Sequence, residues 1–347
     1  MRIDANFYGN SSSAFASLET LIFHDMPEWD EWECKTSAFP SLRYLSVSNC
    51  PKLKGHLSEH LSHLKYQTID VCKQLEIEGV KMETSPFDMI GHHLHSLRIF
   101  FCSDMNILIN HCYGFLVELH ITQSCDSLAN FPLDLFPKLR ELDLVDCRNL
   151  QIISQGHPHR HLKSMRIEKC SEFELFPDEG LFAPQLEKFS IEGLEKLKLM
   201  PKRMSALLPS LNYLNINNCP GVELSDECLP FNLKHVYLLN CSKLVASLKK
   251  EVWGKNPYLE FLSVEKDDME YFPDEGLLPQ SLTELRIKDC LNLKKLDYRG
   301  LCHLSSLQKL FLSKCQILQC LPEEGLPESI SQLIITDCPL LKQRYKK

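Results

Sequence analysis

The chain has 347 residues, of which 44% are apolar and 24% charged, and its formal net charge is −8 at pH 7. These shares are typical of a soluble globular protein, and the acidic balance argues against nucleic acid or an anionic membrane as the main partner. The sequence has no run of 18 apolar residues and therefore predicts no membrane span. Its first residues, MRIDANFYGNSSSAFASLETL, lack the basic start and apolar stretch of a secretory signal.

A repeated pattern runs along almost the whole chain. Residues 42–53 read LRYLSVSNCPKL and residues 282–293 read LTELRIKDCLNL, and both fit the template L-x-x-L-x-[LIV]-x-x-C-x-x-L. Copies of the template begin at Leu18, Leu42, Leu64, Leu94, Leu116, Leu139, Leu162, Leu186, Leu211, Leu233, Leu259, Leu282, Leu307 and Ile330. The fourteen copies have a mean period of about 24 residues, which is the spacing of a solenoid repeat.

Each copy predicts a short strand followed by a turn and a return segment. The L-x-[LIV] part alternates as a strand with one buried face does, and Pro and Gly interrupt the return. Because so short a strand cannot bury its apolar side alone, neighbouring copies must stack and share a core. The predicted fold class is an α/β leucine-rich-repeat solenoid, a curved horseshoe with a concave parallel β-sheet and mostly irregular or short-helical convex returns.

The sequence predicts three segments in chain order. Residues 1–17 are an N-terminal remnant or partial repeat, residues 18–341 form the leucine-rich-repeat array, and residues 342–347 form a basic tail that could cover the last strand. The longest spacing between two copies follows Leu64, and it predicts an inserted loop at residues 76–93.

Most of the sixteen cysteines occupy one template position, directly after the strand. They are Cys50, Cys72, Cys102, Cys147, Cys170, Cys219, Cys241, Cys290, Cys315 and Cys338, with Cys125 added if HITQSC carries one extra residue; Met26, Leu194 and Asp267 replace them elsewhere. We expect small, buried thiols that hydrogen-bond to the turn backbone. Disulfides between stacked neighbours stay open on distance alone, since strands lie about 4.8 Å apart. They would need an oxidising compartment, and we predict reduced thiols instead.

Two further motifs lie in the return segments. The sequences FPDEGL at 176–181 and 272–277 and LPEEGLP at 321–327 predict surface turns, in which Pro fixes φ and Gly permits a positive φ. Histidines gather in GHHLH (91–95) and GHPHRHL (156–162). Because no C-x-x-C pair accompanies them, we expect solvated loop histidines and no metal site.

The sequence offers little for catalysis or nucleotide binding. It contains neither a G-x-S-x-G nucleophile motif nor a G-x-x-x-x-G-K-[ST] phosphate loop, and VWGKN at 252–256 lacks the first Gly and the Ser/Thr. Cys112 and Cys302 adjoin His111 and His303, but adjacency in sequence does not make a thiolate–imidazole pair. We therefore predict no enzyme activity and no cofactor in this chain.

The candidate partner-binding residues are the solvent-facing strand residues of the concave sheet, because the leucine and isoleucine positions fill the core. Aromatic and arginine side chains stand out there, since these types are frequent at interface hot spots. One candidate patch comprises Tyr237, Leu239, Arg286, Lys288 and Phe311, and a second comprises Arg98, Phe100, His120 and Arg166. We predict that the first patch contacts a protein ligand.

The consensus LxxLxLxxCxxLxxLP resembles the repeats of plant intracellular immune receptors. Residues 7–34, FYGNSSSAFASLETLIFHDMPEWDEWEC, and the ending ITDCPLLKQRYKK (335–347) resemble the repeat domain of coiled-coil nucleotide-binding leucine-rich-repeat disease-resistance proteins. The resemblance implies a sensor and autoinhibitory module in the defense response. Such a module contacts a pathogen effector or a host protein and folds against the nucleotide-binding domain of its own receptor. In that family ADP or ATP binds to a domain absent here, so we expect a fragment, a truncated copy or a free-standing sensor half.

Two other classes of protein use the same repeat. A substrate-receptor or adaptor subunit of a ubiquitin ligase would need an F-box, and the 17 residues before the first repeat are too few to fold as one. A secreted or cell-surface receptor would need a signal peptide and a membrane span, although Asn10-Ser11-Ser12 is a formal glycosylation acceptor. We favour the cytoplasmic or nuclear receptor module.

Overall fold

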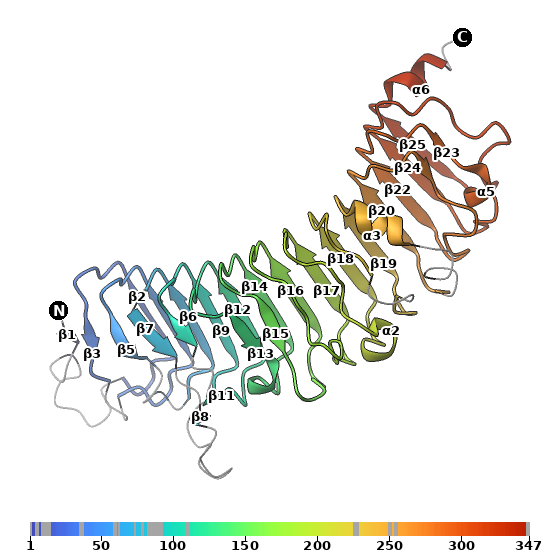
Figure 1. Ribbon diagram of the computed structural model, residues 1–347. Helices are drawn as coiled ribbons and strands as arrows, with labels where there is room; N and C mark the ends of the chain where they lie inside the picture. Colours follow the sequence, from blue (N-terminus) through green and yellow to red (C-terminus); the bar gives the residue numbers. More distant parts are fainter. Residues whose placement is uncertain are drawn as a thin grey trace. The chain divides into compact units, whose positions relative to one another are not determined.

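The computed structural model describes residues 2–3, 7, 15–34, 38–57, 61, 63–72, 74–77, 80–81, 93–107, 111–224, 229–248, 252 and 256–344. The chain divides into two compact units, Met1–Phe173 and Glu174–Lys347. Most of the predicted insertion at 76–93, and residues 345–347 of the predicted tail, lie outside the described residues. In each unit the strands run side by side in the same direction (Figure 1).

Seven parallel strands form the main sheet of the first unit. In spatial order they are β2 (Thr20–His24), β4 (Tyr44–Ser48), β6 (Tyr66–Asp70), β9 (Ser96–Phe100), β12 (Glu118–Thr122), β14 (Glu141–Val145) and β16 (Ser164–Glu168). Each begins two residues after the first residue of a template copy, so the spacing of the leucines predicted where the strands lie.

The second unit has the same construction. Its seven parallel strands are β17 (Lys188–Glu192), β18 (Tyr213–Asn217), β19 (His235–Leu239), β20 (Phe261–Glu265), β22 (Glu284–Lys288), β24 (Lys309–Ser313) and β25 (Gln332–Thr336). The parallel-sheet solenoid predicted from the repeat is therefore confirmed in each unit.

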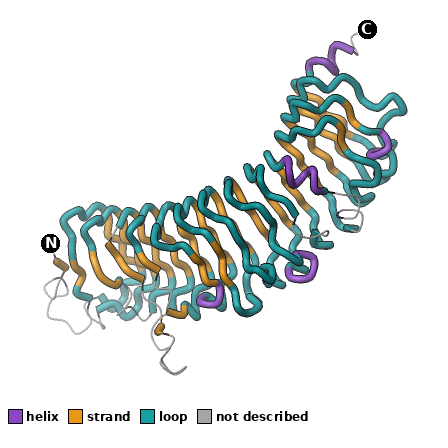
Figure 2. Tube along the Cα trace, viewed as in Figure 1, coloured by secondary structure: helices purple, strands orange, loops and turns teal. Residues whose placement is uncertain are grey.

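The return segments hold only short elements, as predicted. In the first unit these are β1 (Arg2–Ile3), β3 (Glu31–Trp32), β5 (Lys54–His56), β7 (Gln74–Ile77), β8 (Val80–Lys81), β10 (Asn106–Ile107), β11 (His111–Cys112), β13 (Asn130–Pro132), β15 (Ile152–Ser154) and the 3₁₀ turn η2 (Leu133–Leu135). In the second they are β21 (Tyr271–Phe272), β23 (Lys295–Leu296), α2 (Met204–Leu207), α3 (Ser242–Ser247), α5 (Tyr298–Leu301) and α6 (Pro339–Arg344). Figure 2 shows how little of either unit is helical.

The core of each unit is built from the second and fourth residues of its strands. Leu142 and Leu144 of β14 are fully buried, as are Leu285 and Ile287 of β22. Full burial of one such side chain contributes about 1.5–3 kcal/mol, so stacking of neighbouring coils supplies the stability that one strand cannot. Gln67 of β6 departs from this pattern: it is buried at a second position, and its Oε1 accepts no hydrogen bond within the described residues.

The stretch that carries the resemblance to disease-resistance proteins forms an aromatic core in the first unit. The Trp29 ring is fully buried, with its Nε1–H donating to the carbonyl of Glu31 at 2.8 Å. Its ring centroid lies 4.7 Å from that of Phe23 and 6.0 Å from that of Trp32, and Trp32 in turn contacts Phe39. The motif therefore packs the first coils of the unit together.

Each main strand is followed by a residue in the left-handed helical region, and the cysteine position comes next. Asn49, for example, has a φ of 53°, and its N–H donates to the carbonyl of Asp70 in the next coil at 2.9 Å. Asn and Asp tolerate this conformation best among residues with a side chain. Val71 and Phe101 occupy the same position with φ of 50° and 52°, where a β-branched or bulky residue is strained.

Replacing Val71 or Phe101 by asparagine should therefore raise the free energy of unfolding by about 1 kcal/mol each, because left-handed backbone costs such residues about 1–2 kcal/mol. Urea denaturation of the single variants measures the change. Phe101→Leu is the control, since it keeps both the apolar side chain and the strain and should leave stability unaltered. A gain for Phe101→Leu equal to that for Phe101→Asn would contradict the explanation.

The cysteine position has the structural role that the repeat predicts. In ten coils the thiol donates to the carbonyl of the last strand residue, two positions earlier, at 3.0–3.9 Å. The ten side chains are buried, and every cysteine within the described ranges is a free thiol. Burial raises the pKa of the Cys241 thiol to about 12, so this sulfur is a poor nucleophile.

Two sequence-based expectations are corrected by the structure. In HITQSC the cysteine position is occupied by Ser124 and not by Cys125. The Ser124 hydroxyl donates to the carbonyl of Thr122 at 2.7 Å and accepts from the Cys102 N–H at 3.0 Å. Cys125 is buried beside it. His159 was expected in solvent but is buried, with Nε2 hydrogen-bonded to the Phe136 carbonyl at 2.8 Å. Burial lowers the pKa of His159, so this histidine is a neutral structural residue.

Candidate protein-binding surface

The solvent-facing side of the second unit's sheet presents the first, third and fifth residues of each strand. Tyr237, Arg286 and Phe311 are the third residues of β19, β22 and β24, as the sequence predicted. The strand register places Ser263 of β20 between Tyr237 and Arg286. Ser263 is only 2% exposed, although it occupies an outward position of its strand.

Phe261, the first residue of β20, connects Tyr237 of β19 with Arg286 of β22. Its ring centroid lies 4.7 Å from that of Tyr237, and Tyr237 is 5.3 Å from Tyr213 of β18. On the other side the Arg286 guanidinium carbon lies 5.1 Å from the Phe261 centroid and 4.7 Å from the Phe311 centroid. Tyr213, Tyr237, Phe261, Arg286 and Phe311 form one continuous stack, the aromatic–guanidinium ladder, across β18, β19, β20, β22 and β24.

The Arg286 side chain is held on three sides. Besides the two rings, its Nε and Nη2 both lie 2.6 Å from Glu284 Oε1. The other oxygen of the same carboxylate, Glu284 Oε2, is 3.6 Å from Lys309 Nζ. The Arg286 side chain is still 48% exposed, so its charge reaches solvent while its plane is fixed.

The remaining predicted residues of this patch flank the ladder. Leu239 and Lys288 are the fifth residues of β19 and β22. Lys288 Nζ pairs with Glu265 Oε2 at 3.1 Å, and Glu265 Oε1 accepts from Ser263. The structure thus brings all five predicted residues onto one face of the sheet.

Tyr213 and Phe261 are not among the residues predicted from the sequence, because the prediction covered only the third and fifth strand positions. Both lie at the first position, two residues after a template leucine, on the same side of the strand as the third and fifth residues. Tyr213 is half-buried there, and Phe261 is only 9% exposed. An aromatic residue at that offset is the pattern that could have revealed them.

The second predicted patch, in the first unit, is a row of charges. The register aligns Arg98, His120, Asp143 and Arg166 as third residues of β9, β12, β14 and β16. His120 Nδ1 lies 2.8 Å from Asp143 Oδ2. Arg166 Nε and Nη2 pair with Glu168 Oε1 and Oε2 at 2.5 Å and 2.7 Å.

The charged groups of this row are paired on the sheet, although His120 Nε2 is buried without a hydrogen-bond partner among the described residues. Arg98 Nη2 lies 3.9 Å from Glu118 Oε2, and Glu168, which binds Arg166, is buried. Phe100 is half-buried at the fifth position of β9, next to the strained and 51% exposed Phe101. The row lacks the stacked rings of the second unit, and its paired charges have less to offer an incoming partner.

The adjacent Cys302 and His303 of the described surface are engaged individually. Within the described part of the chain, no three His, Cys, Asp or Glu side chains are placed to hold a metal ion. Cys302 donates to the Arg299 carbonyl at 3.6 Å, whereas His303 bonds to the Leu278 carbonyl at 2.9 Å. Each group is therefore engaged with backbone.

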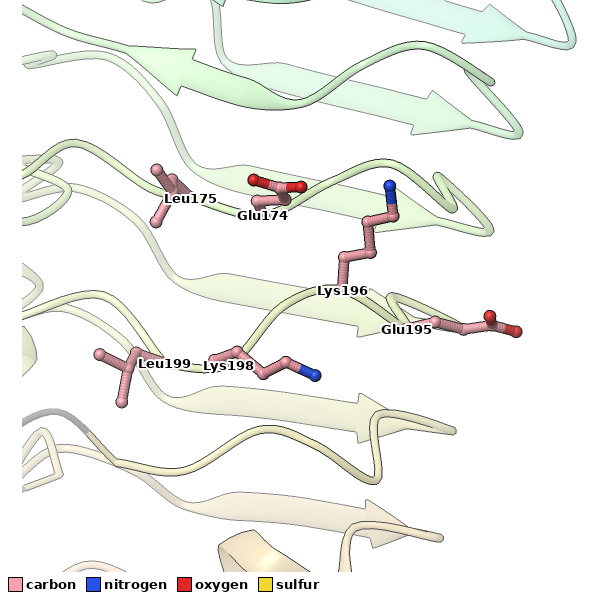
Figure 3. A pocket seen from close by; sticks show the side chains of 6 residues that line it. All are labelled: Glu174, Leu175, Glu195, Lys196, Lys198 and Leu199. Carbon is pink, nitrogen blue, oxygen red and sulfur yellow. The ribbon is translucent and has the colours of Figure 1, made fainter.

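A shallow hollow lies on the return side of the second unit. It has a volume of about 400 Å³ and is lined by Glu174, Leu175, Glu195, Lys196, Lys198 and Leu199. Figure 3 shows Leu175 and Leu199 at one end, on successive turns, with the charged side chains beside them. Both leucines are about half-exposed, so the hollow is a modest apolar spot on a charged surface.

The repeating strand, turn and return, with a cysteine position after each strand, define a leucine-rich-repeat protein with a solvent-facing sheet. Over most of its length the sequence is similar to plant disease resistance proteins. It is 32% identical over 321 residues to the Arabidopsis thaliana disease resistance protein At3g14460, covering 88% of this chain and 22% of that protein. Disease resistance RPP13-like protein 1 of the same plant is 26% identical over 219 residues, covering 61% and 16%.

The chain spans about a fifth of the length of these curated relatives. No family model matches the sequence. The relatives give no support to the ubiquitin-ligase alternative. None of the helices in the described ranges has the length and apolar character that crossing a membrane requires.

Similar solved structures are also leucine-rich-repeat proteins. A Leptospira interrogans repeat protein matches with a TM-score of 0.45 and 16% identity, covering 98% of this chain and 91% of that one. The repeat domain of the type III effector XopL matches with a TM-score of 0.30 and 17% identity, covering 86% and 77%.

Proposed function

We propose that this chain is the protein-recognition module of a plant intracellular immune receptor and acts in the defense response. The observation that carries the proposal is the aromatic–guanidinium ladder. Five neighbouring strands contribute tyrosine, phenylalanine and arginine to one face of the sheet, where a purely structural repeat needs only small polar residues. Phe261 is buried within the ladder, and its other four members are at least partly exposed. These residue types supply most hot-spot energy at protein interfaces. The partner is a protein, either a pathogen effector or a host protein.

The module has a second partner in this proposal, the nucleotide-binding domain of the same receptor. Contact with that domain keeps the receptor inactive, and the ligand shifts the equilibrium by binding the two receptor states with different affinity. The sequence similarity to disease resistance proteins, which are about five times longer than the matched segment, supports this arrangement. Nucleotide binds to that domain, and the module itself takes no cofactor and performs no catalysis.

The compartment in this proposal is the cytoplasm or the nucleus. The column of free, buried thiols supports a reducing environment, because disulfides persist mainly in oxidising compartments.

Changing Tyr237, Arg286 and Phe311 together to alanine should weaken binding of the protein ligand by at least roughly a hundredfold. Truncating one hot-spot residue typically costs about 2 kcal/mol or more, and the three residues belong to one stack. A two-hybrid search with the wild-type chain against pathogen effectors and host proteins identifies the ligand, and calorimetry then measures its affinity.

The matched control replaces Arg98, His120 and Arg166 of the first unit, which occupy the same strand position outside the ladder, and should leave affinity within about threefold. Circular dichroism verifies that both triple variants are folded. Full-strength binding by the folded ladder variant would exclude the ladder as the recognition site.

A further inference from the structure

We infer that Arg286 is a preformed receptor for a carboxylate of the protein partner, so that the partner docks an acidic side chain beside an aromatic or aliphatic one. The inference rests on the proposed function and specifies the chemistry of the surface that the ladder recognises. Four features of the site lead to it.

The first feature is the fixed plane of the guanidinium. Phe261 and Phe311 lie on either side of Arg286, with their ring centroids 5.1 Å and 4.7 Å from its central carbon. A guanidinium stacked between rings keeps its charge and its donors while losing conformational freedom before the partner arrives. The entropy cost of ordering this side chain on binding is therefore largely absent.

The second feature is the unused edge of the guanidinium. Glu284 engages Nε and Nη2 through a single oxygen, Oε1, and thereby orients the group. The Nη1 nitrogen has no acceptor among the residues that the structure describes. The edge formed by Nη1 and the second Nη2 hydrogen is thus available, and its geometry matches the two oxygens of a carboxylate.

Arg166 of the first unit shows what a satisfied arginine looks like at the same strand position. Its Nε and Nη2 bind the two oxygens of Glu168 separately, and Glu168 is buried. A full bidentate carboxylate therefore pairs the Nε–Nη2 edge of Arg166. On Arg286 a single oxygen of Glu284 serves both donors of that edge, and its second oxygen lies near Lys309.

The third feature is the local charge. The outward residues of β20, β22 and β24 include three cations, Arg286, Lys288 and Lys309, and two anions, Glu265 and Glu284. The two lysine side chains are 48% and 47% exposed. This part of the sheet is net positive on a chain whose formal net charge is −8, so it attracts an acidic segment.

The fourth feature is the apolar surface next to the charge. Tyr237, Leu239 and Phe311 are half-buried. Tyr237 and Leu239 lie on β19, which pairs with β20, and Phe311 lies on β24, which pairs with the strand of Arg286. Ring edges carry partial positive charge, so they tolerate carboxylate oxygens while their carbon surface accepts an aromatic or aliphatic side chain. Together these features select an acidic residue adjacent to an apolar one.

The experiment is selection of a phage-displayed library of random short peptides on the full chain, followed by affinity measurements with the selected peptides. We expect enrichment of Asp or Glu next to aromatic or aliphatic residues. Replacing the acidic residue of such a peptide by its amide should weaken binding roughly tenfold to hundredfold. Arg286→Gln should weaken the acidic peptide equally, and the two changes together should cost no more than either alone.

Two further variants separate the alternatives. Arg286→Lys keeps the charge without the fork and should recover only part of the affinity, while Arg166→Gln should leave it unaltered. Peptides that lose binding with Tyr237→Ala and Phe311→Ala but ignore Arg286→Gln would overturn the carboxylate inference and leave the proposed function intact. Peptides that ignore every ladder substitution would contradict the ladder as a recognition site.

Discussion

Alanine at position 180 should lower the free energy of unfolding by about 3 kcal/mol. Gly180 ends a Pro-Asp-Glu-Gly turn with a φ of +99°, and its N–H donates to the Pro177 carbonyl at 2.8 Å. A methyl group built there would lie 2.3 Å from the Lys202 carbonyl oxygen and 2.6 Å from Leu207 Cδ1. Backbone strain contributes about 1 kcal/mol, and the clash with the next coil contributes the remainder because its nearest atom belongs to backbone.

Gly325 provides a matched control in a turn of nearly the same sequence. Its φ is +104° and its N–H donates to the Pro322 carbonyl, but no atom lies within 4 Å of the position of an added methyl group. Gly325→Ala should therefore cost only the conformational part, about 1 kcal/mol. Urea denaturation of both variants measures the difference. Equal losses in the free energy of unfolding would show that the close approach of the next coil to Gly180 does not affect stability.

These glycines illustrate what the sequence could predict. The Pro-Asp-Glu-Gly motif and its Pro-Glu-Glu-Gly counterpart predicted a positive φ, and the structure has one at Gly180, Gly276 and Gly325, because turn chemistry depends on neighbouring residues alone. The strand positions followed from the leucine spacing for the same reason. Whether a methyl group fits at Gly180 depends on its distance from the Lys202 carbonyl in another coil. The residues around Gly180 in the sequence do not determine that distance.

The candidate binding surface also combines features that the sequence predicts with features that depend on contacts between coils. Tyr237, Arg286 and Phe311 could be assigned to one face because side chains alternate along a strand. That Arg286 lies between two rings depends on Phe261, which belongs to the neighbouring strand β20. The position of Ser124 at the cysteine site and the burial of His159 also depend on contacts with other coils, to Cys102 and to Phe136 respectively. The repeat pattern predicts the face on which a side chain lies, and packing between coils determines which side chains contact one another.

Replacing Asp267 by asparagine should raise the free energy of unfolding at neutral pH by about 1–2 kcal/mol. Asp267 occupies the cysteine position in its coil and is only 4% exposed. Its Oδ1 accepts from the Met269 N–H at 3.1 Å, whereas Oδ2 is buried and meets no donor among the described residues. Asparagine keeps the acceptor for Met269 and removes the cost of burying a charge.

The advantage of the asparagine variant should depend on pH in a definite direction. Burial raises the pKa of Asp267 above its ordinary value of 3.8. Between these two pKa values the folded protein holds a proton that the unfolded chain has released, so wild-type stability falls as pH rises through this interval. Below about pH 4 both states are protonated, and the two proteins should differ least there.

Chemical denaturation of wild type and Asp267→Asn across this pH range tests the expectation. Asp268→Asn is the control, because the neighbouring carboxylate is exposed and its removal should alter stability by only about 0.5 kcal/mol or less. A stability difference between wild type and Asp267→Asn that stays constant with pH would mean that Asp267 carries no buried charge. The cysteine position would then accept a carboxylate as readily as a thiol, contrary to the packing argument.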